Sequence, residues 1–290
     1  MFIKTVVLLA AVALAFARRS EILHMENAPE HVVSPLPSTY LKDSDLPKNF
    51  DWRNIDGKNL VTVIRNQHTP QYCGSCWCHA SLGIIGDRVK IQRGGAFPDP
   101  NLSVQQVLSC SNKYAGSCHG GQPSMLFNYL MKNPAVEETC FPYEATDDQW
   151  TQCKFGACYD CHHNLHDYKG SCFAIKNYTK YYVAEHGRVH GELDFMKEIY
   201  ARGPIEVGIC ANDDLDNYKG GIFEDHTGDK CLNHVVVLTG WGEENGVKYW
   251  VMRNSWGGFW GEEGYAKIKR GVDTLAIERQ GWWAVPRVVA

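Results

Sequence analysis

The chain has 290 residues, of which 44% are hydrophobic and 21% charged, ordinary values for a globular protein that exclude a disordered or fibrous chain. Its length allows one large domain or two that share a core. The formal net charge is -4, so nucleic-acid binding has no electrostatic basis. Twelve cysteines are heavy usage, which in a cytosolic protein would indicate metal or redox chemistry.

Residues 1–17 have the features of a secretory signal peptide. Lys4 precedes an apolar run over Val6–Phe16, and Ala15–Ala17 ends it with a small-x-small cleavage pattern. The alternative, a membrane anchor, needs about 20 apolar residues and a basic cytoplasmic flank. We therefore predict entry into the secretory pathway, no membrane span, and cysteines that are mostly disulfide partners because that compartment is oxidising.

Residues 18–45 differ in composition from the rest of the chain. They are rich in Pro, Ser, Glu and His, with few large apolar side chains. Such a segment cannot bury a core of its own, so a disordered tail and a short removable pro-segment both stay open. From Leu46 the density of Trp, Gly and Cys rises, which marks the start of a packed body over 46–290.

The first half of that body has helical patterns. A helix is predicted over Ser75–Gln92, because Ser75 can cap it and Leu82, Ile85 and Val89 recur at helical spacing. Shorter helices are predicted over Ser103–Cys110, Pro123–Met131 and Glu192–Ala201.

The second half has short strand-like runs between Gly-rich turns. These runs are Ile205–Ile209, His234–Thr239, Tyr249–Arg253 and Gly264–Ile268. A helical half followed by a β-rich half predicts an α+β fold with two lobes and a cleft between them.

The string Cys73-Gly74-Ser75-Cys76-Trp77 carries the first chemical signal. A cysteine in the first turn of a helix experiences the positive end of the helix dipole, which favours the thiolate that attacks a carbonyl carbon. Cys76 is therefore the candidate nucleophile, and Cys73 a candidate disulfide partner. Taken alone, two cysteines in a secreted protein are more typical of structural residues.

Residues far downstream supply the partners that such a nucleophile needs. A thiolate requires an imidazolium beside it and a group that orients the imidazole. His234 begins an apolar strand, and Asn254 directly follows another. Either alone would be a structural residue, but with Cys76 in this order they match a Cys-His-Asn triad. Gln67 lies upstream, where its amide can join the Cys76 backbone N–H in stabilising an oxyanion.

Together these motifs resemble the papain family of cysteine peptidases. The resemblance covers essentially all of Leu46–Pro286, from residues 51–53 (Asp-Trp-Arg) to Gly257–Gly261. The intervals from the cysteine to the histidine and asparagine are somewhat longer than usual, which indicates insertions between the lobes. The resemblance implies a papain-like fold with a helical N-terminal lobe, a β-rich C-terminal lobe and an active site in the cleft.

Within this family the chain is most similar to a branch of lysosomal carboxypeptidases. The similarity rests on residues 46–48 (Leu-Pro-Lys), residues 177–179 (Asn-Tyr-Thr) and the stretch Arg65–Cys73, which is longer than in most relatives. It implies a lysosomal setting and removal of single residues from the C-terminus of peptides. By this resemblance His68 binds the substrate's C-terminal carboxylate, helped by Tyr72, whereas a loop histidine is otherwise usually just solvated.

Three further residues are assigned to substrate binding by the same resemblance. Gly120 and Gly121 correspond to a glycine pair along which the substrate backbone runs, because no Cβ intervenes there. An ordinary loop turn is the alternative for these glycines. Trp256 is expected to shield the bond between His234 and Asn254 from water, the alternative being a core tryptophan.

The remaining cysteines allow two interpretations. A zinc site is conceivable in the insert, since C-x2-C with nearby histidines is a metal-ligand spacing, with Cys153, Cys158, Cys161, His162, His163, His166 and Cys172 as candidates. The secretory context favours disulfides instead, so no metal or cofactor is expected. The resemblance implies the pairs Cys73–Cys118, Cys110–Cys153, Cys140–Cys158 and Cys161–Cys172.

Four cysteines remain after that pairing. Cys78 lies on another helix face from Cys76, where relatives carry a small residue, so it is expected to be buried and unreactive. By the resemblance, the family's bridge from the second lobe to the C-terminus is lost, since Val207 and Gly281 stand near where its cysteines would be. Cys210 and Cys231 are candidates for a substitute bridge. Asn101 and Asn177 begin glycosylation motifs and are expected on the surface.

Latency is where the chain departs from its relatives. The branch it resembles carries a pro-segment cysteine that blocks the nucleophile, but residues 18–45 contain none. Covalent latency is therefore in doubt, and noncovalent occlusion by Ser34–Tyr40 stays open.

The sequence thus predicts a cysteine carboxypeptidase that removes single residues through a thioester intermediate. Its expected partners are peptides and proteins with a free C-terminus, and a monomer is expected. The alternatives are an endopeptidase or carboxydipeptidase of the same family and a non-catalytic interaction protein, because fold alone does not establish function.

Overall fold

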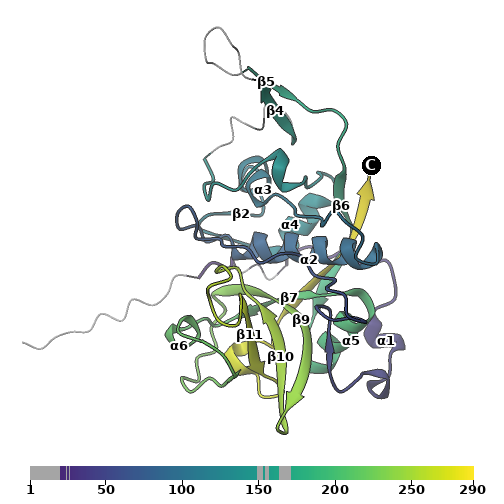
Figure 1. Cartoon of the computed structure of the whole chain (residues 1–290), viewed down its shortest axis with the longest axis vertical. Coiled ribbons are helices and arrows are strands. Elements are labelled where there is room, and N and C mark those ends of the chain that lie inside the picture. The colour runs from purple at the N-terminus through teal and green to yellow at the C-terminus, as the bar shows by residue number, and fades with distance from the viewer. Residues whose placement is uncertain (1–19, 24, 26, 149–152, 154–156, 163–170) are drawn as a thin grey trace, which may run out of the picture.

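The computed structural model describes residues 20–23, 25, 27–148, 153, 157–162 and 171–290. A helical lobe and a β-rich lobe lie against each other, with one long helix between them (Figure 1). Each lobe has its own cluster of buried apolar side chains. The predicted α+β two-lobe fold is confirmed. Among the described residues, no helix is both long enough and apolar enough to cross a membrane.

The central helix is α2 (Cys76–Gln92). The sequence predicted one apolar face, but every residue over 76–90 is buried, because the helix is packed against both lobes. The predicted cap was wrong: the Ser75 side chain does not cap α2, and its Oγ instead lies 2.9 Å from the Tyr143 hydroxyl. Packing from both sides thus fixes this helix, which begins at the candidate nucleophile.

Two shorter helices complete the helical lobe. Helix α3 (Val104–Cys110) is capped as predicted, because the Ser103 side chain accepts a hydrogen bond from the Gln106 backbone N–H. Helix α4 (Pro123–Leu130) begins with a proline in its first turn, where a missing N–H costs nothing. The small ribbon of β2 (Gly116–Ser117) and β3 (Gly120–Gly121) lies beside α2.

The β-rich lobe is built on one sheet with the strand order β6-β12-β7-β9-β10-β11-β8. Its strands are β6 (Lys180–Val189), β7 (Ile205–Ile209), β8 (Ile222–Phe223), β9 (His234–Glu244), β10 (Val247–Arg253), β11 (Tyr265–Lys269) and β12 (Gly281–Val289). Helix α5 (Glu192–Arg202) packs on this sheet, and α6 (Asp213–Asp216) lies beyond β7.

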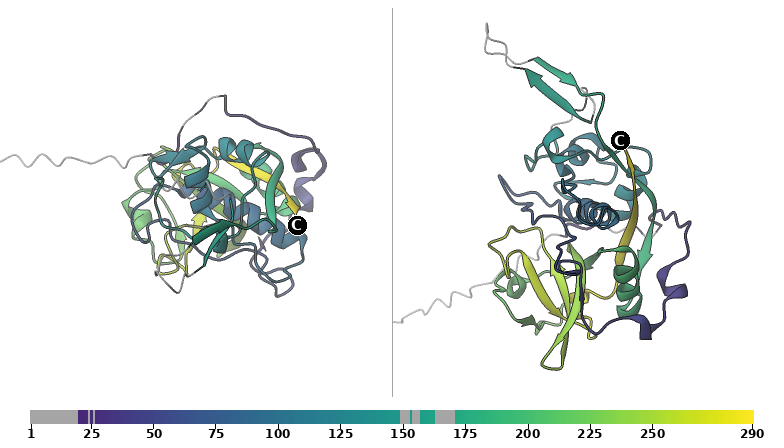
Figure 2. Two further views of the ribbon diagram at one scale, coloured as in Figure 1. Left: turned by 90° about the horizontal axis from the view of Figure 1, so that it is seen from above. Right: turned by 45° about the vertical axis from the view of Figure 1, so that its right-hand side comes forward.

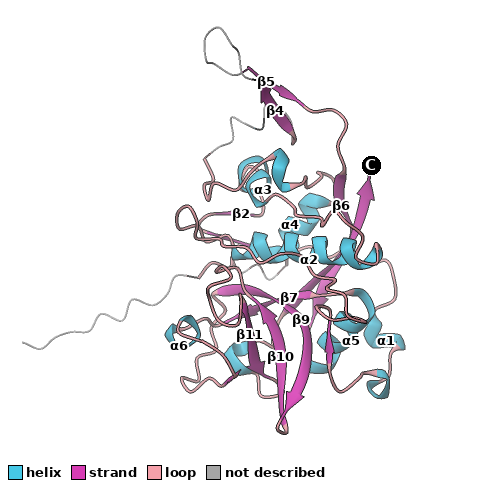
Figure 3. Cartoon of the chain, viewed as in Figure 1, coloured by secondary structure: helices cyan, strands magenta, loops and turns pink. Residues whose placement is uncertain are grey.

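All four predicted strands are present, but the sequence reading missed β6 and β12. These two pair antiparallel along their whole lengths and run from the sheet into the helical lobe (Figure 3). Neither has clean apolar alternation, since β6 carries several charged residues and Pro286 interrupts β12. Where β12 also meets β7, Gly281 lies opposite Val207, at the place where a family disulfide appeared to be lost.

Strand β9 is buried on both faces because its side chains alternate between the two cores. Val235 and Val237 belong to the cluster of the helical lobe, and Val236 and Leu238 to that of the sheet lobe. A strand that is buried on both faces has consecutive apolar residues in its sequence, without polar alternation. This places the start of β9, at His234, directly against the start of α2.

The N-terminal segment, described over residues 20–23, 25 and 27–45, leaves the ribbon at Gly121 and passes along the outer side of β6 (Figure 2). It contains α1 (Pro37–Tyr40), which contacts α5, and the 3-10 turn Asp43–Asp45, and it is followed by β1 (Phe50–Asp51), which pairs with β9. Glu185 on β6 accepts hydrogen bonds from the backbone N–H groups of Val33 and Ser34, each at 2.8 Å. The idea that Ser34–Tyr40 occludes the cleft is therefore wrong.

A hairpin of β4 (Tyr159–His162) and β5 (Ser171–Ala174) projects from the helical lobe (Figure 1). It belongs to the insert in which a zinc site was considered. Cys158 forms a disulfide with Cys140, and Cys161 forms one with Cys172. None of these four sulfur atoms is therefore a free thiolate that could bind a metal. His163 and His166 lie outside the described residues. Elsewhere in the chain, 3-10 turns are formed by Glu138–Cys140 and Thr274–Ala276.

Candidate active site

The candidate triad forms where α2 and β9 begin. Cys76 is the first residue of α2, His234 the first of β9, and Asn254 directly follows β10. The Nε2 atom of His234 lies 2.9 Å from Asn254 Oδ1, and the Cys76 Sγ lies within 4.8 Å of a ring nitrogen of the same histidine. The Val235 backbone N–H also points at Sγ, at 3.4 Å. All three side chains are buried, so their relative positions are held by packing.

Trp256 covers this pair. Its ring stacks on the His234 imidazole with centroids 4.8 Å apart, and it meets Trp260 edge to face. The stacked indole lies where the sequence analysis expected a shield between water and the bond from His234 to Asn254. Shielding strengthens that bond, because its alternative partner would be water.

Gln67 is held in one orientation by its neighbours. The Ser255 hydroxyl donates to Gln67 Oε1 at 2.7 Å, and the Gln67 backbone N–H donates to the Ser255 carbonyl at 2.8 Å. With the amide oxygen engaged, the Nε2 group donates to the Cys73 carbonyl at 3.1 Å and faces the cleft beside Cys76. This is the geometry that an oxyanion donor needs.

The glycine pair forms one wall of the same cleft. A Cβ on Gly121 would lie 2.3 Å from the Trp77 ring, and one on Gly120 would lie 2.9 Å from the Glu21 carbonyl oxygen. Gly121 also exchanges backbone hydrogen bonds with the N-terminal segment, donating to the Glu21 carbonyl and accepting from the Leu23 N–H. An extended segment of the same chain therefore runs along these glycines.

Comparisons with known proteins agree with this geometry. Residues 46–285 match the Papain family cysteine protease family. The chain belongs to the papain family of cysteine proteases. It is 43% identical over 251 residues to cathepsin Z of Onchocerca volvulus, covering 83% of this chain and 78% of that protein. It is 32% identical over 266 residues to cathepsin B-like cysteine proteinase 6 of Caenorhabditis elegans, covering 85% and 68%.

A solved structure shows the same relationship. Digestive procathepsin L 3 of the Tenebrio molitor larval midgut superposes with a TM-score of 0.70 at 27% identity, covering 92% of this chain and 76% of that one. The predicted membership of the papain family is thus confirmed. The chain is a papain-family cysteine protease, and peptides are its substrates.

The loop expected to read a substrate carboxylate lies next to the protease triad. The His68 ring stacks on Tyr72 at 4.8 Å on one side and lies 6.4 Å from the Trp256 ring on the other. Tyr72 is largely exposed at the cleft, and the Asn66 side chain holds the loop by donating to the Thr69 hydroxyl at 2.9 Å. His68 and His234 therefore both neighbour the Trp256 ring.

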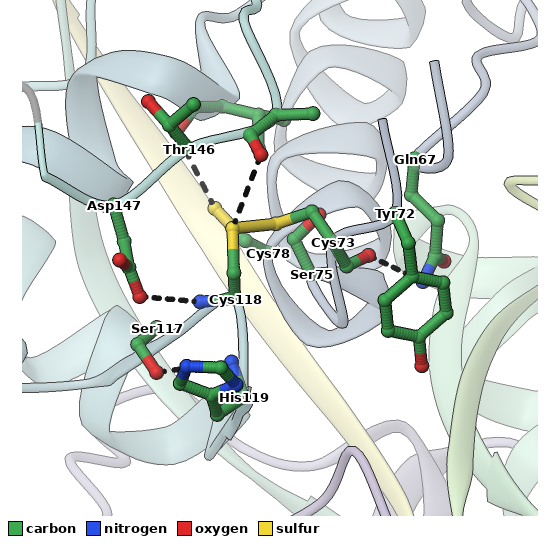
Figure 4. The surroundings of a disulfide bond; sticks show 12 residues. Gln67, Tyr72, Cys73, Ser75, Cys78, Ser117, Cys118, His119, Thr146 and Asp147 are labelled. Carbon is green, nitrogen blue, oxygen red and sulfur yellow. Dashed lines mark hydrogen bonds between the residues drawn. A yellow bond between two sulfur atoms is a disulfide. The ribbon is translucent and has the colours of Figure 1, made fainter. Parts of the chain in front are cut away.

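A disulfide joins the nucleophile loop to the glycine wall. Cys73 is bonded to Cys118, whose backbone N–H donates to Asp147 Oδ2 at 3.0 Å (Figure 4). This bridge fixes the position of Gly120 and Gly121 relative to α2. The pairs Cys110–Cys153, Cys140–Cys158 and Cys161–Cys172 are also present.

Cys210 and Cys231, whose pairing the sequence left open, form a fifth disulfide. The free cysteines of the described residues are Cys76 and Cys78. Cys78 is buried against α3, where its Sγ lies 4.0 Å from the Val104 carbonyl, and burial raises the pKa of its thiol well above the usual range. It therefore has the environment of an inert core thiol.

The two glycosylation motifs differ in exposure. Asn177 is exposed, as an acceptor must be. Asn101 is only partly exposed, and its Oδ1 accepts a short hydrogen bond from Arg65. The described structure thus suits attachment at Asn177 better than at Asn101.

Sequence reasoning missed Glu21, which lies in the catalytic centre. Its Oε2 accepts from Gln67 Nε2 at 3.0 Å and lies 3.6 Å from His234 Nδ1, while its Oε1 accepts from the Tyr72 hydroxyl. Burial alone would raise the pKa of this carboxyl, but the contacts with His234 and Tyr72 outweigh it and lower the pKa from 4.5 to about 2. No pattern in residues 18–45 distinguishes this glutamate from its neighbours.

The Glu21 carboxylate also affects the pKa of the candidate nucleophile, Cys76. Burial raises the pKa of the Cys76 thiol well above its usual range, and the negative charge of Glu21 raises it further. The sequence analysis expected the helix dipole to favour the thiolate. In this structure, burial and the Glu21 charge both act against the thiolate while Glu21 occupies the cleft.

Proposed function

We propose that this chain is a cysteine carboxypeptidase that removes single residues from the C-terminus of peptides and proteins. The observation that carries the proposal is the row of stacked rings formed by Tyr72, His68, Trp256 and His234. A cationic imidazole one ring beyond the catalytic histidine can bind the carboxylate of a residue that follows the scissile bond directly. The resemblance to cathepsin Z supports this assignment.

The proposed chemistry uses the groups already described. The Cys76 thiolate attacks the last peptide carbonyl carbon, and its oxygen becomes an oxyanion that Gln67 Nε2 and the Cys76 backbone N–H stabilise. His234 gives its proton to the leaving amino acid as the C–N bond breaks, which leaves a thioester. His234 then takes a proton from water, whose oxygen attacks the thioester carbonyl; the C–S bond breaks and releases the shortened peptide and the Cys76 thiolate. Asn254 keeps the imidazole oriented throughout.

The proposal also covers the chain's processing and setting. Residues 1–17 act as a signal peptide, residues 18–45 as a pro-segment, and residues 46–290 as the peptidase domain. The oxidised pairs fit a lysosomal or secreted protein, since such bonds persist in the secretory pathway. We expect the active enzyme to work as a monomer.

The test compares one peptide with a free and an amidated C-terminus. Amidation removes the negative partner of His68, so kcat/KM should fall by about 10- to 100-fold, the range for a charge-assisted hydrogen bond. His68→Ala should lower kcat/KM on the free peptide by a similar factor and leave the amidated peptide nearly unchanged. Mass spectrometry of the products should show loss of single C-terminal residues.

His226→Ala is the matched control, because His226 is an exposed loop histidine outside the site. It should alter neither substrate. General damage to Gln67 by the loop substitution would weaken both substrates alike. If the wild-type enzyme cleaves free and amidated peptides equally well, or releases internal fragments, the endopeptidase alternative replaces this proposal.

A further inference from the structure

The first residues of the described chain lie inside the cleft. Ile22 is 4% exposed and belongs to the apolar cluster of the helical lobe, while it bridges to Gly121 in the glycine wall. The Glu21 backbone N–H donates to the Asn233 carbonyl, on the opposite side of the cleft, at 2.9 Å. Residues 20–23 are thus bound on both walls.

The group that these residues present to the nucleophile is not a peptide bond. The carbonyls of Glu21, Ile22 and Leu23 accept hydrogen bonds from the Gly121 N–H, the Ser20 hydroxyl and the Gln122 side chain. The backbone is therefore engaged elsewhere, and the Glu21 side-chain carboxylate lies within 4.8 Å of both Cys76 Sγ and the His234 ring nitrogen. A carboxylate carries no leaving group that the thiol could displace.

The contacts of that carboxylate are those that catalysis requires. It accepts the Gln67 Nε2 hydrogen that would otherwise stabilise the oxyanion, and it faces the His234 Nδ1 atom that would otherwise face the thiol. It also engages the Tyr72 hydroxyl at the far end of the cleft. A hydrolysed peptide likewise ends in a carboxylate beside these groups, so the Glu21 side chain has the chemistry of a bound product.

We propose that Ser20–Leu23 is a built-in inhibitor in which the Glu21 carboxylate, acting as a product mimic, holds the catalytic centre latent without a covalent bond. This replaces the thiol-based block that the chain lacks, since residues 18–45 contain no cysteine. Residues 30–34 tether the inhibitor outside the cleft through Glu30 on Arg188 and Glu185 on Ser34. Tethering keeps its local concentration high until the segment is cut.

The test measures how fast a thiol-directed epoxide labels Cys76 in the full-length chain, with the labelled residue identified by peptide mapping. Glu21→Gln removes the charge and keeps the shape, so labelling should accelerate by about 10- to 100-fold, the range for losing a charge-assisted hydrogen bond. Asp43→Asn is the matched control on the same segment, since Asp43 Oδ1 pairs with Lys197 Nζ at 2.7 Å, outside the residues that tether the inhibitor. It should label at nearly the wild-type rate.

A second variant keeps the test decisive if Glu21→Gln folds poorly. Tyr72→Phe leaves the carboxylate in place but removes one of its donors, and should accelerate labelling by about 2- to 10-fold, as expected for a neutral hydrogen bond. A folded Glu21→Gln chain that labels at the wild-type rate, or an Asp43→Asn chain that labels as fast as Glu21→Gln, would overturn the proposal. Labelling requires only a reactive thiol, so the result is independent of which end of a peptide the enzyme shortens.

Discussion

Two faces of helix α2 each carry a free cysteine, and the two thiols have different surroundings. On the face toward the sheet lobe, Cys76 meets the first residue of β9, the Val235 N–H and the Glu21 carboxylate. On the face toward α3, Cys78 meets a backbone carbonyl and apolar side chains. Both thiols are buried and have a raised pKa. Burial does not distinguish the two thiols, so we expect the groups placed beside Cys76 by β9 and the N-terminal segment to decide its reactivity.

The largest expected effect is on the cysteines themselves. Cys76→Ala should abolish turnover, a loss of at least about 10,000-fold, because nothing else in the site can form the thioester. Cys78→Ala should retain most activity, since it removes a small buried group that touches no reacting atom. Steady-state kinetics on chains freed of residues 18–45 would measure both. Comparable losses from the two substitutions would contradict the assignment of Cys76 as nucleophile.

The face of α2 toward the sheet lobe also carries a buried ion pair. Arg253 donates to both carboxylate oxygens of Asp87, at 2.7 and 3.0 Å, and neither side chain reaches solvent to any extent. Asp87→Asn leaves a buried guanidinium without its charge, so the free energy of unfolding should fall by about 3 to 5 kcal/mol. Chemical denaturation monitored by tryptophan fluorescence would measure it.

Asp99→Asn is the matched control for that prediction. Asp99 pairs with Lys90 of the same helix at 2.7 Å, but its carboxylate is 37% exposed. Partial solvation limits the loss there to about 1 kcal/mol. Equal losses of unfolding free energy in the Asp87 and Asp99 variants would mean that burial between the lobes adds nothing to the contribution of the Asp87 ion pair.

The smallest expected effect is a dependence on pH. The Glu21 carboxyl has its pKa lowered from 4.5 to about 2, so its hold on the catalytic centre is complete above about pH 4.5 and weakens as pH falls toward 2. The titratable groups that face it are Cys76, His234 and Tyr72, with His68 stacked behind the tyrosine. Mild acid alone should therefore leave the full-length chain latent.

The ratio of Cys76 labelling rates in the Glu21→Gln and wild-type chains measures this effect. The ratio should shrink below about pH 4.5, where a Glu21 carboxyl released from the cleft begins to protonate. A ratio that falls toward one already near pH 6 would show that a group other than Glu21 controls how residues 20–23 are held in the cleft.

The sequence allowed much of this architecture to be predicted, and the failures have physical causes. Helix α2 and strands β7, β9, β10 and β11 were predictable because local periodicity and flanking turns define them. Strands β6 and β12 depend on pairing between Lys180–Val189 and Gly281–Val289, which are far apart in the sequence, and this leaves a weak local signal. The order Cys76, His234, Asn254 was visible through motifs, but the placement of Glu21 depends on tertiary contacts that no residue pattern encodes.

The ribbon formed by β6 and β12 has a consequence for how the molecule unfolds. Neighbouring tryptophans of β12 serve opposite lobes, since Trp282 is buried in one apolar cluster and Trp283 in the other. On β6, Tyr181 and Val183 likewise belong to the helical lobe, while Val189 packs against the sheet cluster. Neither lobe can lose its core without exposing that of its neighbour. We therefore expect the body to unfold in a single cooperative transition, with neither lobe folding on its own.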